Sequence, residues 1–559
     1  MKYMFILLLV GLAVSCSDKS AQVEMDARQL IDSLTVVVKP LQKESALAYW
    51  NASASGEDQY YDRYAELNME LTEVFSNPQT FKKLERFKSA KIRNPELARQ
   101  VELLYLQFLA NQTDPELLNQ ITRLSTQVEQ RFNTFRAVVD GKQLSTNEIK
   151  EILSSSKDQE LRRKVWEASK QVGPLVEKDF IRLVELRNQS ARAVGFDNFY
   201  EMQLILGEQE PAEIERIFTE LDETTRQPFV EIKQEIDQNL AEQFGISPAE
   251  LRPWHYSDPF FQEAPVVTEV NLDQYYQDQD VVELARQFYN SIGINVDTIL
   301  ENSDLYEREN KYPHAYCTNI DHEGDVRVMM NVNPTEAWMS TALHELGHAV
   351  YDLKQDFSAP YFLRGPTHAF TTEAVAIFFE RLSKNPNWMQ QALNLTDQQK
   401  RAISDLTAKT LRMEKLVFAR WSLVMLNFEK ELYADPTQDL NVLWWDLVEK
   451  YQMVNRPEGR NMPDYAAKIH ICLYPVYYHN YQLGGLLEAQ FRKALARSQD
   501  LKNVQDIRYM NNPEVGRFFV EKVFFPGKRY RWDEMIIRAT GERLTSRYFT
   551  EQLRSAVGN

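Results

Sequence analysis

The sequence predicts a mostly α-helical protein with minor β structure. Glycine is scarce, at 18 residues in 559, whereas Leu, Glu, Gln, Arg and Ala are plentiful, as in helical proteins. No long stretch alternates between apolar and polar residues in the way half-buried strands do. After residue 40 the chain has no linker rich in Ser, Gly and Pro, no low-complexity segment and no internal repeat. We therefore expect one large domain over residues 31–559.

The N-terminus has the features of a secretory signal. Lys2 precedes an apolar run from Met4 to Val14 that is too short to span a bilayer. The run ends in Leu-Ala-Val-Ser-Cys16, which is similar to a bacterial lipoprotein processing site, although the leucine stands one position earlier than in the strict pattern. We expect residues 1–15 to be removed, Cys16 to carry lipid, and residues 16–30 to form the anchor and linker of a cell-envelope protein, periplasmic or surface-facing. The alternative is an ordinary cleaved signal followed by a stray cysteine.

Charge and cysteine content exclude two classes of protein. The net charge is −17, and the acidic residues are spread along the chain, so nucleic acid is not expected as a partner. Besides Cys16 the chain has only Cys317 and Cys472, too few for a disulfide framework. Because free cysteines are often buried, we expect two buried, unpaired thiols.

Two stretches in the middle of the chain predict local structure other than helix. Residues 325–332 alternate and are rich in valine, which predicts a short edge strand to which a peptide could add as a further strand. The stretch from Ser247 to Pro265 is rich in helix breakers. It is either a crossing between two parts of the protein or a surface loop.

The run His344-Glu345-Leu-Gly-His348 is the most specific motif. It lies in an apolar-rich stretch at helical spacing, which predicts a largely buried helix. Two histidines four residues apart face the same side of a helix, with a carboxylate beside them, which is half of a zinc site. Buried histidine and glutamate side chains need partners. The alternative is a helix whose polar groups satisfy one another in the core.

Glu373 is the candidate for the third metal ligand that a catalytic zinc needs. It follows His344 by 29 residues and lies in a second predicted helix, residues 371–380, opened by a threonine cap. The loop between the helices carries Pro360, Gly365 and Pro366 and would form a helical hairpin. The alternative is that Glu373 only completes a capping turn. Two histidines and a carboxylate suit zinc best, so we expect one Zn²⁺ per chain.

These residue types predict peptide hydrolysis. A zinc ion on His344, His348 and Glu373 would polarise a bound water, and Glu345 would take its proton and pass it to the leaving nitrogen of a peptide. The sequence thus predicts a metallopeptidase that acts on peptides.

With these residues in place, the chain resembles the angiotensin-converting-enzyme-like family of peptidyl-dipeptidases. The metal motif followed by a glutamate at this distance carries the likeness. Other segments that resemble the family are Leu161–Glu167, Arg187–Ala191 with Gly195-Phe196, His314-Ala315, Trp444–Leu447, Lys450–Gln452, Lys468–Ile471 and Tyr477–Tyr481. The likeness spans about residues 145 to 495, and the related oligopeptidase F and thimet-type enzymes share much of it. It implies two helical halves around a deep channel with the metal helix at its floor.

The resemblance also implies roles for residues outside the metal motif. His470 and a tyrosine would stabilise the oxyanion; alignment from the downstream Gln490-Phe491 points to Tyr481, and Tyr478 is the rival. The tyrosines of this stretch fall at helical spacings, so core packing is the alternative.

The predicted substrate contacts come from two further segments. His314 and Ala315 would contact the substrate backbone. Lys468 and Tyr478 would bind the terminal carboxylate, which is the contact that makes a peptidase release dipeptides. The alternative is that Lys468 is a surface lysine.

The chain departs from the family pattern at two places. Val448 and Asn480 stand where the animal enzymes carry chloride-binding arginines, which puts chloride dependence in doubt. Ile377 stands where the family has an acidic residue that supports a metal-bound histidine. Another group must supply that acceptor, or zinc affinity is weaker.

Together these features predict a lipid-anchored zinc metallopeptidase that cuts short peptides and releases dipeptides from their C-termini. The rival is an endo-acting oligopeptidase with the same zinc chemistry. A third possibility is a non-catalytic surface lipoprotein that binds peptides.

Overall fold

The computed structural model describes residues 2–265 and 271–555, except for the side chains of residues 2–19, 405–406 and 554–555. These residues form helices and two small two-stranded sheets, which confirms the predicted all-α class with minor β. Cys16 lies in the stretch whose side chains are not described, so its lipidation stays a prediction. Within the described ranges, no helix is both long and apolar enough to cross a membrane.

The chain forms two compact units, each assembled from three separate stretches. Unit 1 contains residues 1–112, 273–383 and 494–543, and unit 2 contains residues 113–272, 384–493 and 544–559. The breaker-rich stretch from Ser247 to Pro265 lies inside unit 2, and the chain passes to unit 1 only after Leu272.

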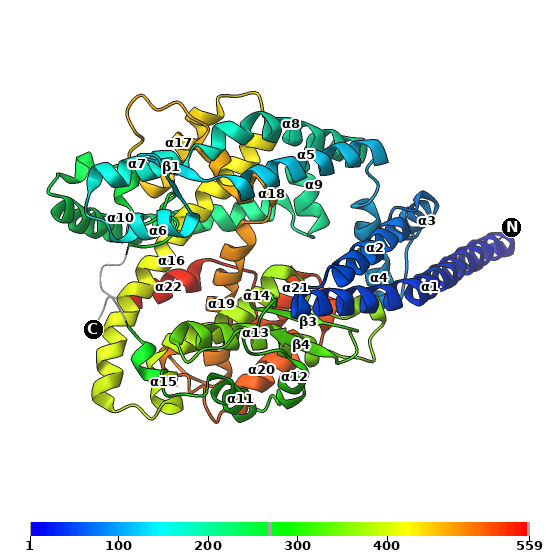
Figure 1. The fold of residues 1–559 in the computed structure, drawn as a ribbon. Helices are drawn as coiled ribbons and strands as arrows, with labels where there is room; N and C mark the ends of the chain where they lie inside the picture. Colours follow the sequence, from blue (N-terminus) through cyan, green and yellow to red (C-terminus); the bar gives the residue numbers. More distant parts are fainter. Residues whose placement is uncertain (1, 266–270, 556–559) are drawn as a thin grey trace. The chain divides into compact units, whose positions relative to one another are not determined.

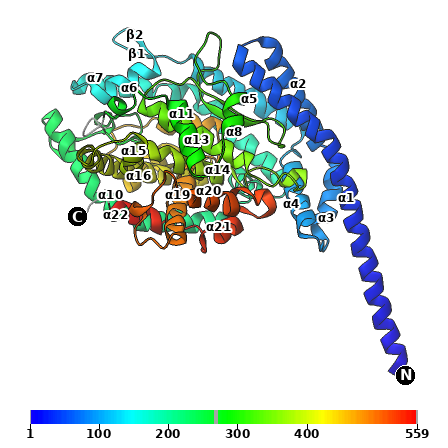
Figure 2. The same ribbon diagram turned by 90° about the horizontal axis from the view of Figure 1, so that it is seen from below.

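The helices and strands are drawn in Figures 1 and 2. Those of unit 1 are α1 (Lys2–Ser55), α2 (Asp58–Phe75), α3 (Pro78–Ser89), α4 (Pro95–Leu109), α11 (Val281–Ser291), α12 (Asp297–Asn302), β3 (Tyr316–Asn319), β4 (Val326–Met329), α13 (Glu336–Leu353), α14 (Ala369–Glu380), α20 (Pro513–Phe519) and α21 (Trp532–Thr540). Those of unit 2 are α5 (Pro115–Thr134), β1 (Ala137–Val139), β2 (Lys142–Leu144), α6 (Thr146–Ser155), α7 (Gln159–Ser169), α8 (Val172–Ala193), α9 (Phe199–Leu206), α10 (Pro211–Phe244), α15 (Pro386–Ala392), α16 (Asp397–Ala434), α17 (Leu440–Gln452), α18 (Ile469–Leu473) and α22 (Arg547–Ser555). Most of α19 (His479–Ser498) also belongs to unit 2.

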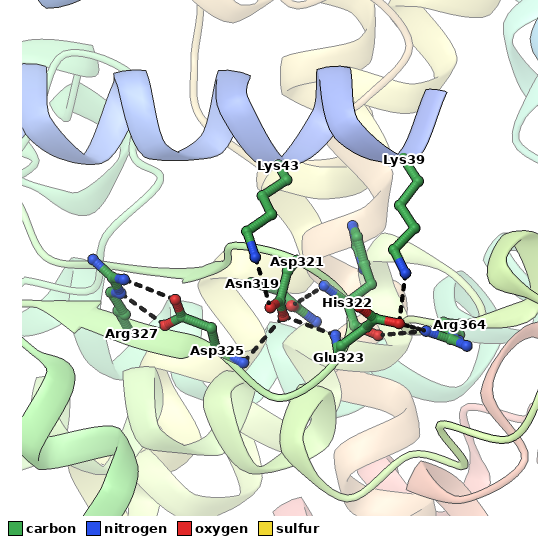
Figure 3. Close-up of polar contacts among 9 residues, drawn as sticks. All are labelled: Lys39, Lys43, Asn319, Asp321, His322, Glu323, Asp325, Arg327 and Arg364. Atoms are coloured by element: carbon green, nitrogen blue, oxygen red, sulfur yellow. Dashed lines mark hydrogen bonds and ion pairs between the residues drawn. The ribbon is translucent and has the colours of Figure 1, made fainter. Parts of the chain in front are cut away.

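Helix α1 is attached to unit 1 by an apolar face and by ion pairs. Buried side chains such as Ile31 and Val38 pack in one cluster with residues of α3 and α4. Directly after Val38, Lys39 pairs with Glu323 at 2.7 Å, and one turn further on Lys43 pairs with Asp321 at 3.4 Å; both acidic residues lie on the loop between β3 and β4 (Figure 3). Exposed ion pairs contribute about 0–1 kcal/mol each, so the apolar face is the stronger attachment.

The β3–β4 hairpin differs from the prediction of an edge strand at residues 325–332. Strand β4 covers only Val326–Met329 and pairs with β3 on one side. On its other side, Asp304 donates to the Val328 carbonyl at 3.1 Å and accepts from the Met330 amide at 2.8 Å. The predicted strand is therefore an inner one, and the edge strand of the hairpin is β3.

Helices α13 and α14 lie side by side and place the candidate metal ligands (Figure 1). Helix α13 begins after Thr335, whose side chain accepts the Trp338 amide. A Cβ atom on Gly347 would lie 3.0 Å from the Cα atom of Ala376, so the glycine is what allows the two helices to approach this closely. Helix α14 begins two residues earlier than predicted, and its cap is His368 rather than a threonine.

Candidate active site

The two histidines of the metal motif and Glu373 converge between α13 and α14. The Nε2 atoms of His344 and His348 are 3.2 Å apart, and carboxylate oxygens of Glu373 lie 3.8 and 3.9 Å from them. Among the described residues, this is the only group of three His, Cys, Asp or Glu side chains that is arranged to hold a metal ion. The structure thus brings the three predicted ligands together.

The donor set fits a zinc ion. Zn–N distances of about 2.0–2.1 Å in a tetrahedral site place two ligand nitrogens about 3.3 Å apart, close to the separation of the two histidines. The three side chains keep 17% to 25% of their surface exposed, which leaves room for a fourth ligand such as water or substrate. An open fourth position is typical of catalytic rather than structural zinc sites.

Each candidate histidine ligand is oriented by a hydrogen bond from α14. The Nδ1 atom of His344 lies 2.6 Å from Oε2 of Glu380, and Nδ1 of His348 lies 2.7 Å from Oγ1 of Thr372. Such contacts fix the ring orientation and leave Nε2 for the metal. Glu380 supplies the acceptor that Ile377 cannot provide, and the sequence analysis did not identify it. Its spacing of seven residues from Glu373, two turns along the same helix face, was the signal for it.

The charges around His344 differ from those around His348, so the pKa values of the two histidines differ as well. Burial lowers the pKa of His344, but the hydrogen bond and charge of Glu380, with the charges of Glu345 and Glu373, raise it to about 9. The pKa of His348 falls to about 3 because of burial and the neighbouring His344. Burial raises the pKa of Glu373. The site is thus an anionic pocket that stabilises positive charge near His344.

Glu345 is 8% exposed and lies beside the ligand group without belonging to it. Burial raises its pKa to about 7, against the lowering effect of His344, and the charges of Glu373 and Glu380 add to the rise. The backbone N–H of Cys317 on β3 donates to its carboxylate. A carboxyl group with a pKa near neutrality is suited to accept and return a proton.

The structure places the predicted residues at and just before β3 as follows. His314 is exposed, with its ring against Tyr312 at a centroid distance of 5.4 Å, and no contact links it to the metal group. Ala315 leads directly into β3. Both remain predictions as substrate contacts. Cys317 is a free thiol but is only partly buried, unlike Cys472, which is fully buried as predicted.

In unit 2, Lys468 lies in an enclosure of aromatic rings. Its Nζ atom is 2.6 Å from Oε1 of Gln262 and 5.3 to 5.5 Å from the ring centroids of Phe260, Trp421 and Tyr478. Burial lowers the pKa of Lys468 to about 8, although the charges of Asp258 and Glu263 raise it. The side chain is a buried cation and not a surface lysine, and a carboxylate would be a suitable partner. Gln262, 206 residues away in sequence, was not foreseen.

His470 and the tyrosines are close to Lys468 but do not form one helix. Helix α18 ends at Leu473 and α19 begins at His479, so the helical spacing of the tyrosines is interrupted. The ring of Tyr478 lies 5.1 Å from that of His470 and 5.3 Å from that of Tyr481. The Nδ1 atom of His470 is buried without a protein partner, and burial with the charge of Lys468 lowers the pKa of His470 to about 4. At neutral pH the ring is uncharged and can donate one hydrogen bond. The catalytic roles of His470 and Tyr481 stay predictions.

The two positions that depart from the chloride-binding pattern carry an apolar and an amide side chain. Val448 lines a small cavity in unit 2 with Lys170 and several aromatic side chains. The Asn480 side chain accepts a hydrogen bond from Gln209 at 2.7 Å. Neither residue brings the charge of an arginine.

Two protein-family models match this chain, and both describe peptidases. Residues 152–555 match the model of peptidase family M3, and residues 21–246 match the model of angiotensin-converting enzyme. The first match covers more than half of the chain and contains every candidate site residue. These matches confirm the predicted resemblance and establish a protease of the metallopeptidase class. The chain therefore belongs to peptidase family M3, a family of zinc-dependent metallopeptidases, and its residues 21–246 are similar to angiotensin-converting enzyme.

Proposed function

We propose that this protein is a zinc-dependent peptidase that cuts short peptides and releases dipeptides from their C-termini. The observation that supports it most is the convergence of His344, His348 and Glu373 beside the buried carboxyl group of Glu345. This combination provides a metal site with an open position and a proton acceptor next to it.

The residues of unit 1 can perform the proton transfers of hydrolysis. A bound zinc would activate water and polarise the substrate carbonyl. Glu345 takes the proton of the attacking water and returns it to the leaving nitrogen. His344 and His348 hold their Nε2 atoms toward the metal because Glu380 and Thr372 bind their Nδ1 atoms.

The outer edge of β3 can align the peptide. Cys317 faces Val328, whose backbone N–H and C=O bind Ser303 and Asp304 on the side away from β3. In an antiparallel pair of this kind, the backbone groups of Cys317 also point away from the partner strand. We propose that an extended substrate binds along this edge, at Ala315 and at the carbonyl of Cys317, whose N–H donates to Glu345, so that the scissile bond lies near Glu345.

In unit 2, we propose that Lys468 and Tyr478 bind the substrate's C-terminal carboxylate and that His470 and Tyr481 donate hydrogen bonds to the oxyanion. The buried cation supports the first proposal, because a buried ammonium with few charged partners gains most from a carboxylate. This contact is what distinguishes release of dipeptides from internal cleavage.

The test uses a free peptide and its C-terminally amidated twin, with products identified by mass spectrometry. Wild type should remove dipeptides from the free peptide only, and Glu345→Gln should be inactive while still binding zinc. Lys468→Met should lose the preference for the free C-terminus. Internal cleavage of both peptides by wild type would favour the endo-acting oligopeptidase. Intact peptides with zinc bound would favour a peptide-binding protein.

We also propose that the mature chain begins at Cys16 and is held in the bacterial cell envelope by lipid on that residue. The supporting observation is the short apolar run that ends at a cysteine. Intact mass of the membrane-extracted protein should equal residues 16–559 plus acyl chains, and Cys16→Ser should move the protein to the soluble fraction. Wild-type protein without any lipid on Cys16 would contradict lipidation.

A further inference from the structure

The connection between α18 and α19 has a backbone conformation that its own sequence does not favour. Val476 lies in this connection with φ of 55° and is 6% exposed. A β-branched residue rarely adopts the left-handed conformation, because its side chain collides with the backbone. Contacts from outside the connection must therefore hold it.

Glu429 of α16 makes one of these contacts. Its carboxyl group is buried and accepts the Val476 N–H at 2.7 Å. Burial raises the pKa of Glu429 to about 8, while the Val476 N–H and the charge of Arg187 lower it. Burying a carboxyl group in this way is costly, and the proposed hydrolysis does not use it.

Arg187 of α8 makes the second contact, with the last turn of α18. Its guanidinium group is buried and donates to the Cys472 carbonyl at 3.0 Å and to the Tyr433 hydroxyl at 3.2 Å. A cation therefore holds a carbonyl of α18 just before the connection, and a carboxyl group holds an amide within the connection. Each of the two residues comes from a different long helix of unit 2.

The two contacts lie between the residues that the proposed reaction uses. Cys472 is two residues after His470, and Val476 is two residues before Tyr478. The rings of His470 and Tyr478 pack edge to face at 5.1 Å, so a shift of the connection would change their relative position. A displacement of about 1 Å in a positioned group can cost up to about 100-fold in rate.

We propose that Glu429 and Arg187 are positioning residues that set the distance and orientation of His470 relative to Tyr478 and Tyr481. This inference rests on the proposed peptidase function. Neither residue contacts the substrate in this scheme; both act through the backbone of residues 472–476.

The kinetic test compares Glu429→Ala with Glu429→Gln and the double variant Glu429→Ala/Val476→Gly. Glu429→Ala should lower kcat roughly 10- to 100-fold and raise KM for the free peptide by a smaller factor, because Lys468 precedes the connection and only Tyr478 of the two carboxylate-binding residues follows it. Glu429→Gln keeps an oxygen acceptor and should stay within about 2-fold of wild type. The added glycine adopts positive φ without strain and should restore part of the lost kcat.

A matched control separates positioning from general stability. Asp222→Asn weakens another ionic contact of α16, the 2.6 Å bond between Asp222 and Arg420, away from the connection. It should lower the melting temperature and leave kcat unchanged. If Glu429→Ala also lowers only the melting temperature, or if glycine at position 476 rescues nothing, the proposal is wrong.

Hydrogen–deuterium exchange gives a readout that does not depend on activity. In wild type a peptide covering residues 472–481 should be protected, and Glu429→Ala should increase its exchange while Asp222→Asn does not. Equal exchange in all three proteins would overturn the inference. Inactive wild-type protein with the expected exchange pattern would instead contradict the proposed function and leave Glu429 as the residue that holds this connection.

Discussion

Glu380 shows how one residue off the metal motif can determine metal affinity. Its carboxylate accepts a hydrogen bond from Nδ1 of His344 at 2.6 Å, which fixes the ring and leaves Nε2 for the metal. We predict that Glu380→Ala weakens zinc binding about 10- to 100-fold, measured by competition with a chromophoric chelator. Glu380→Gln, which keeps an acceptor oxygen, should lose less. Wild-type affinity in the alanine variant would show that His344 needs no such support.

Lys468 predicts a pH limit on the recognition of free C-termini. Because burial lowers its pKa to about 8, the ammonium group is charged below that pH and neutral above it. The pH dependence of kcat/KM reports the free enzyme, so kcat/KM for a free peptide should fall above about pH 8.

The amidated peptide and an arginine variant are the controls for Lys468. For the amidated peptide, kcat/KM should not fall at the same pH. Lys468→Arg keeps its charge at high pH and should extend the active range, although the guanidinium shape differs. A parallel fall for both peptides would assign the pH limit to another group.

At this scale, the sequence predicted those site residues whose partners are local. His344 and His348 share a helix face through their four-residue spacing, and Glu373 lies on the next α-helix along the chain. Gln262 beside Lys468 and Glu429 beside Val476 come from distant stretches and meet only in the folded chain. Spacing along one helix carries no information about such contacts.

Among the elements, the α13–α14 pair depends on Gly347. An alanine methyl there would lie 3.0 Å from the Cα atom of Ala376, which is backbone and cannot move aside cheaply. We predict that Gly347→Ala destabilises the protein by about 1–3 kcal/mol and weakens zinc binding, because the helices that carry the ligands must separate.

Gly485 of α19 is the matched control, because a Cβ atom there would have no neighbour within 4 Å. Gly485→Ala should stabilise by about 0.5–1 kcal/mol, since alanine favours the helix and nothing resists the methyl group. Urea unfolding of both variants measures the two effects. If Gly347→Ala stabilised the protein, α13 and α14 could separate without a loss of stability.

The predicted elements failed where pairing or backbone conformation depended on remote groups. The valine-rich segment of β4 has the pattern of an edge strand, but Asp304 pairs with its second side. The tyrosines after His470 have helical spacing, but the backbone turns at Val476, where Glu429 holds the amide. In both cases a residue far away in sequence changed what the local pattern favours.

At the scale of the whole molecule, the candidate metal ligands belong to unit 1 alone, so metal binding and folding should be coupled there. A ligand that binds only the folded state stabilises it by RT ln(1 + [L]/Kd), about 4 kcal/mol at a thousand-fold excess over Kd. Removing zinc with a chelator should therefore lower the melting temperature by several degrees, and added zinc should restore it.

His344→Ala should melt at the same temperature with and without zinc. If unit 2 unfolds in a separate transition, that transition should not move. Metal analysis should first confirm that zinc removal is complete. If the melting temperature is then unchanged, the ligand group is already held in place without metal.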